Sequence, residues 1–164
     1  FFTGRSQESP LARSRQPFDS VTPGGNSLQA ANLLRLSEWT GEAALRREAE
    51  ATIRSLAGAL RHHPSGMAEM LAALDFALGP TLQVVLAGSW DEAAPLRHEV
   101  FRRFLPRKVT AGWPAHGEPA ALEMLVHRDR VGGRAAAYVC RNSTCERPIT
   151  VAAYLEASLA GGGS

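Results

Sequence analysis

Residues Phe18–Leu36 read FDSVTPGGNSLQAANLLRL, and this stretch decides how the first half of the chain folds. Its first part is a polar turn rich in proline and glycine, whereas its second part has the apolar spacing of an amphipathic helix. Asn26 is a typical helix-capping residue, and Gln29 follows three positions later, as in a capping box. The pattern predicts a helix from Asn26 to about Trp39, and Gly41 supplies a residue type that tolerates a left-handed cap.

Helical periodicity continues as far as Gly79. An apolar stripe with steps of 4, 4, 3 and 4 residues predicts a second helix over residues 42–62. Because the turn between the two helices is short, they should form an antiparallel αα-hairpin. A third helix is predicted over residues 65–78. The stripe consists of Leu45, Ala49, Ile53, Leu56 and Leu60, and the third helix is expected to bury Met67, Met70, Leu71, Leu74 and Leu78.

The period changes at Leu82–Ala87, which reads LQVVLA, as expected for a buried strand of a parallel sheet. Ser89 and Glu92 form a second capping-box pattern, which introduces a helix that ends before Pro106. A strand at Lys108–Ala111 would complete a β-α-β unit with a right-handed crossover. The helix between these two strands is expected to bury Leu96, Val100, Phe101, Phe104 and Leu105. Further predicted elements are a hairpin turn at Gly132-Gly133, a strand over 135–140 and a closing helix over 150–159 capped by Thr150, while 121–126 fits either a strand or a helix.

The predicted fold class is mixed α/β and helix-rich, with an αα-hairpin and a third helix followed by a small β-α-β type unit. We divide the chain into an irregular loop over 1–25, a helical segment over 26–80, an α/β segment over 81–160 and a flexible tail over 161–164.

Composition excludes several functional classes. The 18 basic and 16 acidic residues are interleaved, so no basic face suits a nucleic acid backbone. No apolar run reaches the roughly 18 residues that a membrane span needs, and no secretory signal opens the chain. We therefore expect neither nucleic acid nor membrane as a partner, and a cytoplasmic location. Because the chain begins with Phe1 and stops at Ser164 after three glycines, we expect it to be a fragment of a longer protein.

Several motifs in order resemble one family. PGGNS at Pro23–Ser27 followed by AANLLRL, ALDFALGP at Ala73–Pro80, LQVVLAG, FLPRKV at Phe104–Val109 and AAAYVCRNSTCERPIT at Ala135–Thr150 are similar to the C-terminal stretch of the spermatogenesis-associated protein 20 family. Its members are also called thioredoxin-domain-containing or YyaL-like proteins. The resemblance covers roughly residues 18–159. One departure is Gly24, where the family usually has a serine.

The resemblance implies a longer architecture. A thioredoxin-like domain precedes an (α/α)6 barrel like those of six-hairpin glycosidases and N-acylglucosamine epimerases. This chain would then hold the last helices of the barrel and the C-terminal α/β segment. The implied partners are the N-terminal remainder of the protein and a carbohydrate-type small molecule.

Asp19 and Asn26 are the candidate ligand-binding residues. Loops at the helix N-termini of such barrels line the central pocket, where acidic and amide side chains bind sugar hydroxyls. The alternative is that Asn26 is a helix cap and Asp19 a turn residue. A glycosidase also needs a second carboxylate roughly 5–10 Å from the first, and the sequence identifies none. No complete catalytic site and no cofactor are therefore expected in this chain.

Cys140 and Cys145 form the second candidate site, a thiol pair with four intervening residues. Redox pairs commonly have two intervening residues at a helix N-terminus, whereas this pair follows a predicted strand. The cysteines fit buried structural thiols, a disulfide or redox-sensitive pair, or a metal site shared with other parts of a longer chain. Neither His116 nor His127 has ligand spacing, so we predict no metal site within this chain.

Three functional hypotheses follow. The chain completes a barrel wall in a protein related to carbohydrate-processing enzymes, or it is a non-catalytic interaction or structural module, or it has a thiol-redox role through its cysteines. A truncated barrel should leave the stripe from Leu45 to Leu60 exposed to water, so we also expect self-association of the isolated chain.

Overall fold

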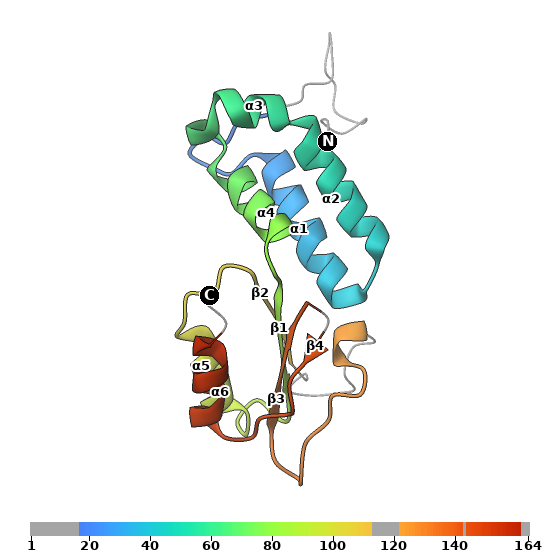
Figure 1. The fold of residues 1–164 in the computed structure, drawn as a ribbon, viewed down its shortest axis with the longest axis vertical. Coiled ribbons are helices and arrows are strands. Elements are labelled where there is room, and N and C mark those ends of the chain that lie inside the picture. Colours follow the sequence, from blue (N-terminus) through green and yellow to red (C-terminus); the bar gives the residue numbers. More distant parts are fainter. Residues whose placement is uncertain (1–16, 113–121, 143, 162–164) are drawn as a thin grey trace. The chain divides into compact units, whose positions relative to one another are not determined.

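The computed structural model describes residues 17–112, 122–142 and 144–161 (Figure 1). The described residues form two compact units, the first within residues 17–37 and 42–79 and the second within residues 38–41 and 80–161. Most of the predicted N-terminal loop, residues 1–16, lies outside the described residues, as do Trp113, His116, Ala121 and the tail after Gly161.

The first unit is helical. Its elements are α1 (Gly25–Thr40), α2 (Ala43–Ser55), α3 (Ala57–His62), the 3-10 helix η1 (Pro64–Gly66) and α4 (Ala68–Leu78). The single helix predicted over 42–62 is interrupted at Leu56, where φ is −109° and ψ is 5°. The Leu56 amide donates to the carbonyl of Ile53, three residues back, and Gly58, a poor helix former, lies two residues further on.

The core of the helical unit contains Leu34, Met67, Met70 and Phe76. The stripe that we expected to be bare is covered, since Ala49, Ile53, Leu56 and Leu60 are all buried. The burial predicted for Met67 and Met70 is confirmed, whereas Leu71 and Leu78 are exposed and Phe76 is buried instead. Exposed leucines therefore lie two turns apart on α1 and again on α4; they are Leu28, Leu36, Leu71 and Leu78.

The second unit is built on a four-stranded sheet with the order β2-β1-β3-β4. The strands are β1 (Leu82–Ala87), β2 (Lys108–Gly112), β3 (Ala136–Arg141) and β4 (Thr144–Cys145). β1 and β2 are parallel, as the predicted β-α-β unit requires. β3 is antiparallel to β1, however, so the sheet is mixed. The predicted turn at Gly132-Gly133 is confirmed by a bridge between Val131 and Arg134 and by φ values of +58° and +73°.

Two helices, α5 (Ala94–Phe101) and α6 (Ala152–Ala160), cover one face of this sheet (Figure 1). The core between these helices and the sheet contains Val84 of β1, Val139 of β3, Val100 of α5 and Leu155 of α6. Side chains alternate along a strand, so Tyr138 and Cys140 point to the opposite face. The 3-10 helix η2 (Glu123–Leu125) lies beside that face in the ambiguous stretch 121–126.

Two details of these helices correct the sequence prediction. α5 ends at Phe101, so Phe101 and Phe104 are 59% and 91% exposed instead of buried. α6 begins at Ala152, and its cap position is held by Val151 and not by Thr150. The hydrogen bonds of the Ser89–Glu92 capping box form, since the Ser89 amide donates to the Glu92 carboxylate at 3.2 Å and the Glu92 amide donates to the Ser89 hydroxyl at 3.4 Å. They lie in the turn before α5, however, and the cap position of the helix is Ala93.

Candidate functional site

Asp19 lies in the turn before α1, and both of its carboxylate oxygens accept hydrogen bonds from the backbone. Oδ1 accepts from the Gly24 amide at 2.7 Å, just before α1 begins. Oδ2 accepts from the Glu69 amide at 2.9 Å, in the first turn of α4. The Asp19 amide in turn donates to the carbonyl of Gly66 at 2.8 Å. The carboxylate thus satisfies free amides at the starts of two helices and fixes the turn against both.

These hydrogen bonds also control the charge of Asp19. Partial burial by itself would raise the pKa of the carboxyl group, but hydrogen bonds from the backbone of Gly24 and Glu69 outweigh it. The pKa of Asp19 therefore lies below its ordinary value of 3.8. An ionised carboxylate at neutral pH also complements the positive ends of the two helix dipoles.

Asn26 lies near this turn, but it is not the cap of α1. The helix begins at Gly25, so Asn26 is in its first turn, where it is 5% exposed. The structure brings Asp19 and Asn26 into the same end of the helical unit. Their role toward a sugar stays a prediction, and the hydrogen bonds of Asp19 to two backbone amides are those of a structural carboxylate.

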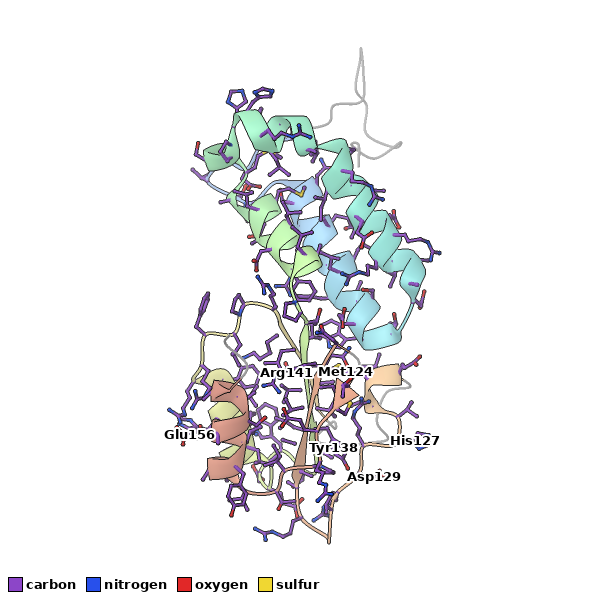
Figure 2. All side chains as sticks on the ribbon, in the orientation of Figure 1. Met124, His127, Asp129, Tyr138, Arg141 and Glu156 are labelled. Carbon is purple, nitrogen blue, oxygen red and sulfur yellow. A yellow bond between two sulfur atoms is a disulfide. The ribbon has the colours of Figure 1, made fainter. Side chains whose placement is uncertain are left out.

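The cysteine pair is joined as a disulfide between β3 and β4 (Figure 2). Cys140 and Cys145 are directly opposite each other, with Cα atoms 3.9 Å apart. Asn142, with φ of +48°, begins the turn between the strands. Of the two cysteines, Cys140 is 1% exposed, whereas Cys145 is exposed at the sheet edge.

Arg128 is the functional candidate that the sequence did not reveal. Its Nη2 atom lies 3.5 Å from Sγ of Cys140 and 3.4 Å from Sγ of Cys145, while Nη1 donates to the carbonyl of Met124 at 2.7 Å. His127 precedes it in the left-handed region, with φ of +58°, where the chain turns after η2. Sequence spacing gives no sign of the contact between Arg128 and the sulfurs, because the contact depends on the three-dimensional path of the segment after η2.

A hydrogen bond from β3 holds that segment in place. The Tyr138 hydroxyl donates to the carbonyl of Asp129 at 2.7 Å. Tyr138 and Cys140 are two residues apart on β3 and therefore share a face. The same face thus carries both the anchor of the segment and the sulfur that Arg128 contacts (Figure 2).

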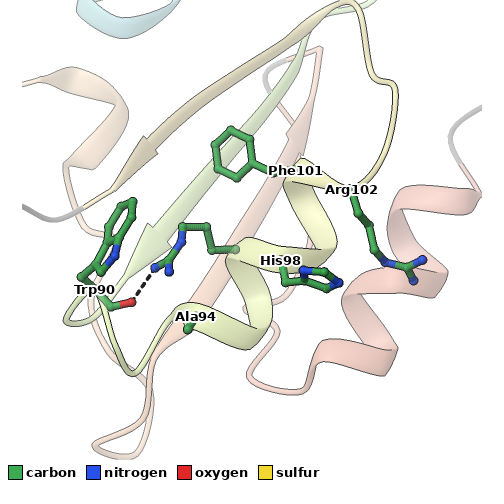
Figure 3. A pocket seen from close by; sticks show the side chains of 6 residues that line it. Trp90, Ala94, His98, Phe101 and Arg102 are labelled. Atoms are coloured by element: carbon green, nitrogen blue, oxygen red, sulfur yellow. Dashed lines mark hydrogen bonds between the residues drawn. The ribbon is translucent and has the colours of Figure 1, made fainter.

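An open pocket of about 630 Å³ lies along α5, lined by Trp90, Ala94, Arg97, His98, Phe101 and Arg102 (Figure 3). The guanidinium of Arg97 stacks on the Trp90 indole, with Cζ 3.6 Å from the ring centre, and Nη1 donates to the Trp90 carbonyl at 2.5 Å. Arg102 is paired with Glu99 and Glu156. The pocket's guanidinium groups are thus held by the protein itself, and its lining contains no carboxylate.

Neither a metal centre nor a membrane span is present in the parts of the chain that the structure describes. No group of three or more His, Cys, Asp or Glu side chains in residues 17–112, 122–142 and 144–161 could hold a metal ion. Over the same ranges, no helix has the length and apolar character needed to cross a bilayer.

Comparison with known proteins confirms the family resemblance. Over 145 residues, 84% of the chain, it is 30% identical to human Spermatogenesis-associated protein 20. Proteins of the same name from Rattus norvegicus and Mus musculus are 29% and 28% identical over the same length. The matched stretch is 18% of each relative's length. No family model and no solved structure matches the chain.

Proposed function

Because the chain is a homologue of spermatogenesis-associated protein 20 over 84% of its length, we propose that it is the C-terminal part of a protein of that family. In this proposal its helical unit completes an (α/α)6 barrel related to those of carbohydrate-processing enzymes, after a thioredoxin-like domain. The chain supports the barrel and has no full active site of its own. A match to only 18% of each relative is what a segment of a larger body would give.

The exposed leucines of the helical unit are the observation that carries this proposal. Leu71 and Leu78 lie two turns apart on α4, with exposed fractions of 37% and 79%, and Leu28 and Leu36 lie two turns apart on α1, with 42% and 39%. Aligned apolar residues on the surface of two helices are typical of a contact surface that another element covers. In the proposal, the neighbouring helices of the barrel cover them.

Asp19 supports a structural role for this end of the unit. A carboxylate that binds a sugar or transfers a proton needs oxygen lone pairs directed at the ligand. Each oxygen of Asp19 already accepts a hydrogen bond from a backbone amide, of Gly24 or Glu69, which leaves fewer lone pairs for a ligand. Sugar binding by Asp19 and Asn26 remains the narrower part of the proposal.

Complementation between two polypeptides tests the proposal. The chain and the preceding part of the longer protein are expressed separately and mixed, and we expect them to form a stable complex. Leu71→Ser with Leu78→Ser should weaken that complex about tenfold or more, because the substitutions remove apolar side chains that the complex would bury. Val21→Ser with Val126→Ser is the matched control, since both valines are exposed outside the leucine rows. Equal binding by both double variants would contradict the proposed surface.

A separate measurement addresses the carbohydrate relation. Binding of N-acetylglucosamine by the longer protein is measured by calorimetry, together with the melting temperature of each variant. Asn26→Ala should lower the free energy of sugar binding by more than it lowers the free energy of unfolding, because a residue that binds the sugar loses its contacts with the ligand as well as those within the protein. If affinity is unchanged and only the melting temperature falls, Asn26 has no ligand role.

A further inference from the structure

The two sulfurs of the Cys140–Cys145 disulfide are not equivalent. Cys140 is almost fully buried on β3, whereas Cys145 is exposed on the two-residue edge strand β4. A thiolate from solution can approach a disulfide only along the S–S axis of an accessible sulfur. Attack would therefore occur at Sγ of Cys145 and release the sulfur of Cys140.

Arg128 is placed to stabilise the sulfur that leaves. Its Nη2 atom is within 3.5 Å of both sulfurs, so a thiolate formed at either is beside a guanidinium without any rearrangement. A neighbouring cation favours the thiolate over the thiol and makes it a better leaving group. The Met124 carbonyl and the Tyr138–Asp129 hydrogen bond hold the arginine and its segment at this position.

The hairpin itself is held together by other contacts. The Glu146 amide donates to the Val139 carbonyl at 2.9 Å, and Arg141 pairs with Glu146. Ser158 of α6 ties both in place, since its carbonyl accepts from Arg141 at 2.7 Å and its hydroxyl donates to Glu146 at 2.7 Å. A disulfide that closes so short a loop restricts the unfolded chain less than one that closes a long loop. Its reduction should therefore leave the two cysteines facing each other, ready to reoxidise.

We propose that Cys140 and Cys145 form a thiol–disulfide exchange site in which Cys145 is the attacked sulfur and Arg128 holds the Cys140 thiolate. The co-reactant is an external thiol. Its thiolate forms a mixed disulfide with Cys145, and the electron pair of the broken S–S bond goes to Cys140. A second external thiol releases Cys145, so two thiols are oxidised to one disulfide while the protein gains two electrons and two protons.

This inference does not depend on the proposed barrel, because every residue it uses lies in the second unit. The first experiment measures the rate at which dithiothreitol reduces the full 164-residue chain, by alkylation and mass spectrometry. Arg128→Gln should slow reduction about tenfold, since the leaving thiolate loses its cation. Arg128→Lys should recover part of the rate, because it keeps the charge.

Arg134→Gln is the matched control, since Arg134 is an exposed arginine of the same unit, in the turn before β3. It should leave the rate unchanged. The proposed role of Arg128 is wrong if Arg128→Gln and Arg134→Gln are reduced at the same rate. It is also wrong if the disulfide of Arg128→Lys is reduced no faster than that of Arg128→Gln.

A second experiment tests which sulfur is attacked. The variants Cys140→Ser and Cys145→Ser each keep one thiol and are treated with oxidised glutathione. We expect the adduct on Cys145 to form at least about tenfold faster than the adduct on Cys140, because only Cys145 is accessible. Equal rates, or faster reaction of Cys140, would overturn the assignment. Circular dichroism of both variants confirms that they are folded.

Discussion

Each unit of this chain holds an irregular segment in place, but the two use different chemistry. In the helical unit, the turn around Asp19 is fixed by a carboxylate that accepts backbone hydrogen bonds at the starts of α1 and α4. In the sheet unit, the hairpin after β3 is closed by a covalent bond with a guanidinium beside it. The first anchor depends on ionisation and the second on oxidation, so acid should loosen one unit and thiols the other.

Removal of the Asp19 carboxylate should have the largest effect. Asp19→Ala leaves the amides of Gly24 and Glu69 without their acceptor, which should cost about 3 kcal/mol of unfolding free energy for the helical unit. Urea unfolding followed by circular dichroism at neutral pH measures it. The control Glu48→Ala removes an exposed carboxylate from α2 and should change stability by less than about 0.5 kcal/mol. Equal effects would mean that Asp19 is an ordinary surface acid.

Removal of the disulfide should have the next largest effect. Cys140→Ala with Cys145→Ala should lower the stability of the sheet unit by about 2 kcal/mol, the value for a short closed loop. The fluorescence of Trp90, which lies in this unit, follows its unfolding in urea. A loss greater than about 4 kcal/mol, or a molten sheet, would show that the disulfide supports more than the hairpin.

Acid should separate the two anchors. Because the pKa of Asp19 is below its ordinary value of 3.8, its contribution is present above that pH and is lost as pH falls through the lower folded value. The helical unit should then lose part of the roughly 3 kcal/mol assigned to Asp19. Asp19→Asn should lack this part of the acid sensitivity. A disulfide does not titrate, so the same pH change should leave the hairpin closed in both proteins.

Tyr138 should have the smallest effect on stability. Tyr138→Phe removes the hydrogen bond to the Asp129 carbonyl and should cost about 1 kcal/mol or less. It should also free the segment that carries Arg128, which faster amide hydrogen exchange in residues 124–130 would reveal. Tyr154→Phe is the control, because Tyr154 is 70% exposed on α6. If exchange is the same in both variants, the hydroxyl does not position the segment.

The features that could be predicted from the sequence are those that depend on residues close to one another in the chain. The Ser89–Glu92 capping box involves a three-residue spacing, and the strand at Leu82–Ala87 and the Gly132-Gly133 turn follow from local composition. The antiparallel direction of β3 could not be predicted, because it depends on which strand it pairs with. The same holds for the sites: Asp19 contacts the amide of Glu69, 50 residues away, and Arg128 contacts sulfurs 12 and 17 residues later.

The segment after the disulfide hairpin protects one edge of the sheet and thereby favours solubility. Beyond β4 the chain continues along β3, where Ala137 and Ile149 exchange both of their backbone hydrogen bonds, at 2.8 and 2.9 Å. The outermost edge of the sheet is thus a two-residue strand followed by charged residues and Pro148, which has no amide hydrogen to donate. Such an edge is a poor template for another strand, so this side of the sheet is protected against edge-to-edge aggregation.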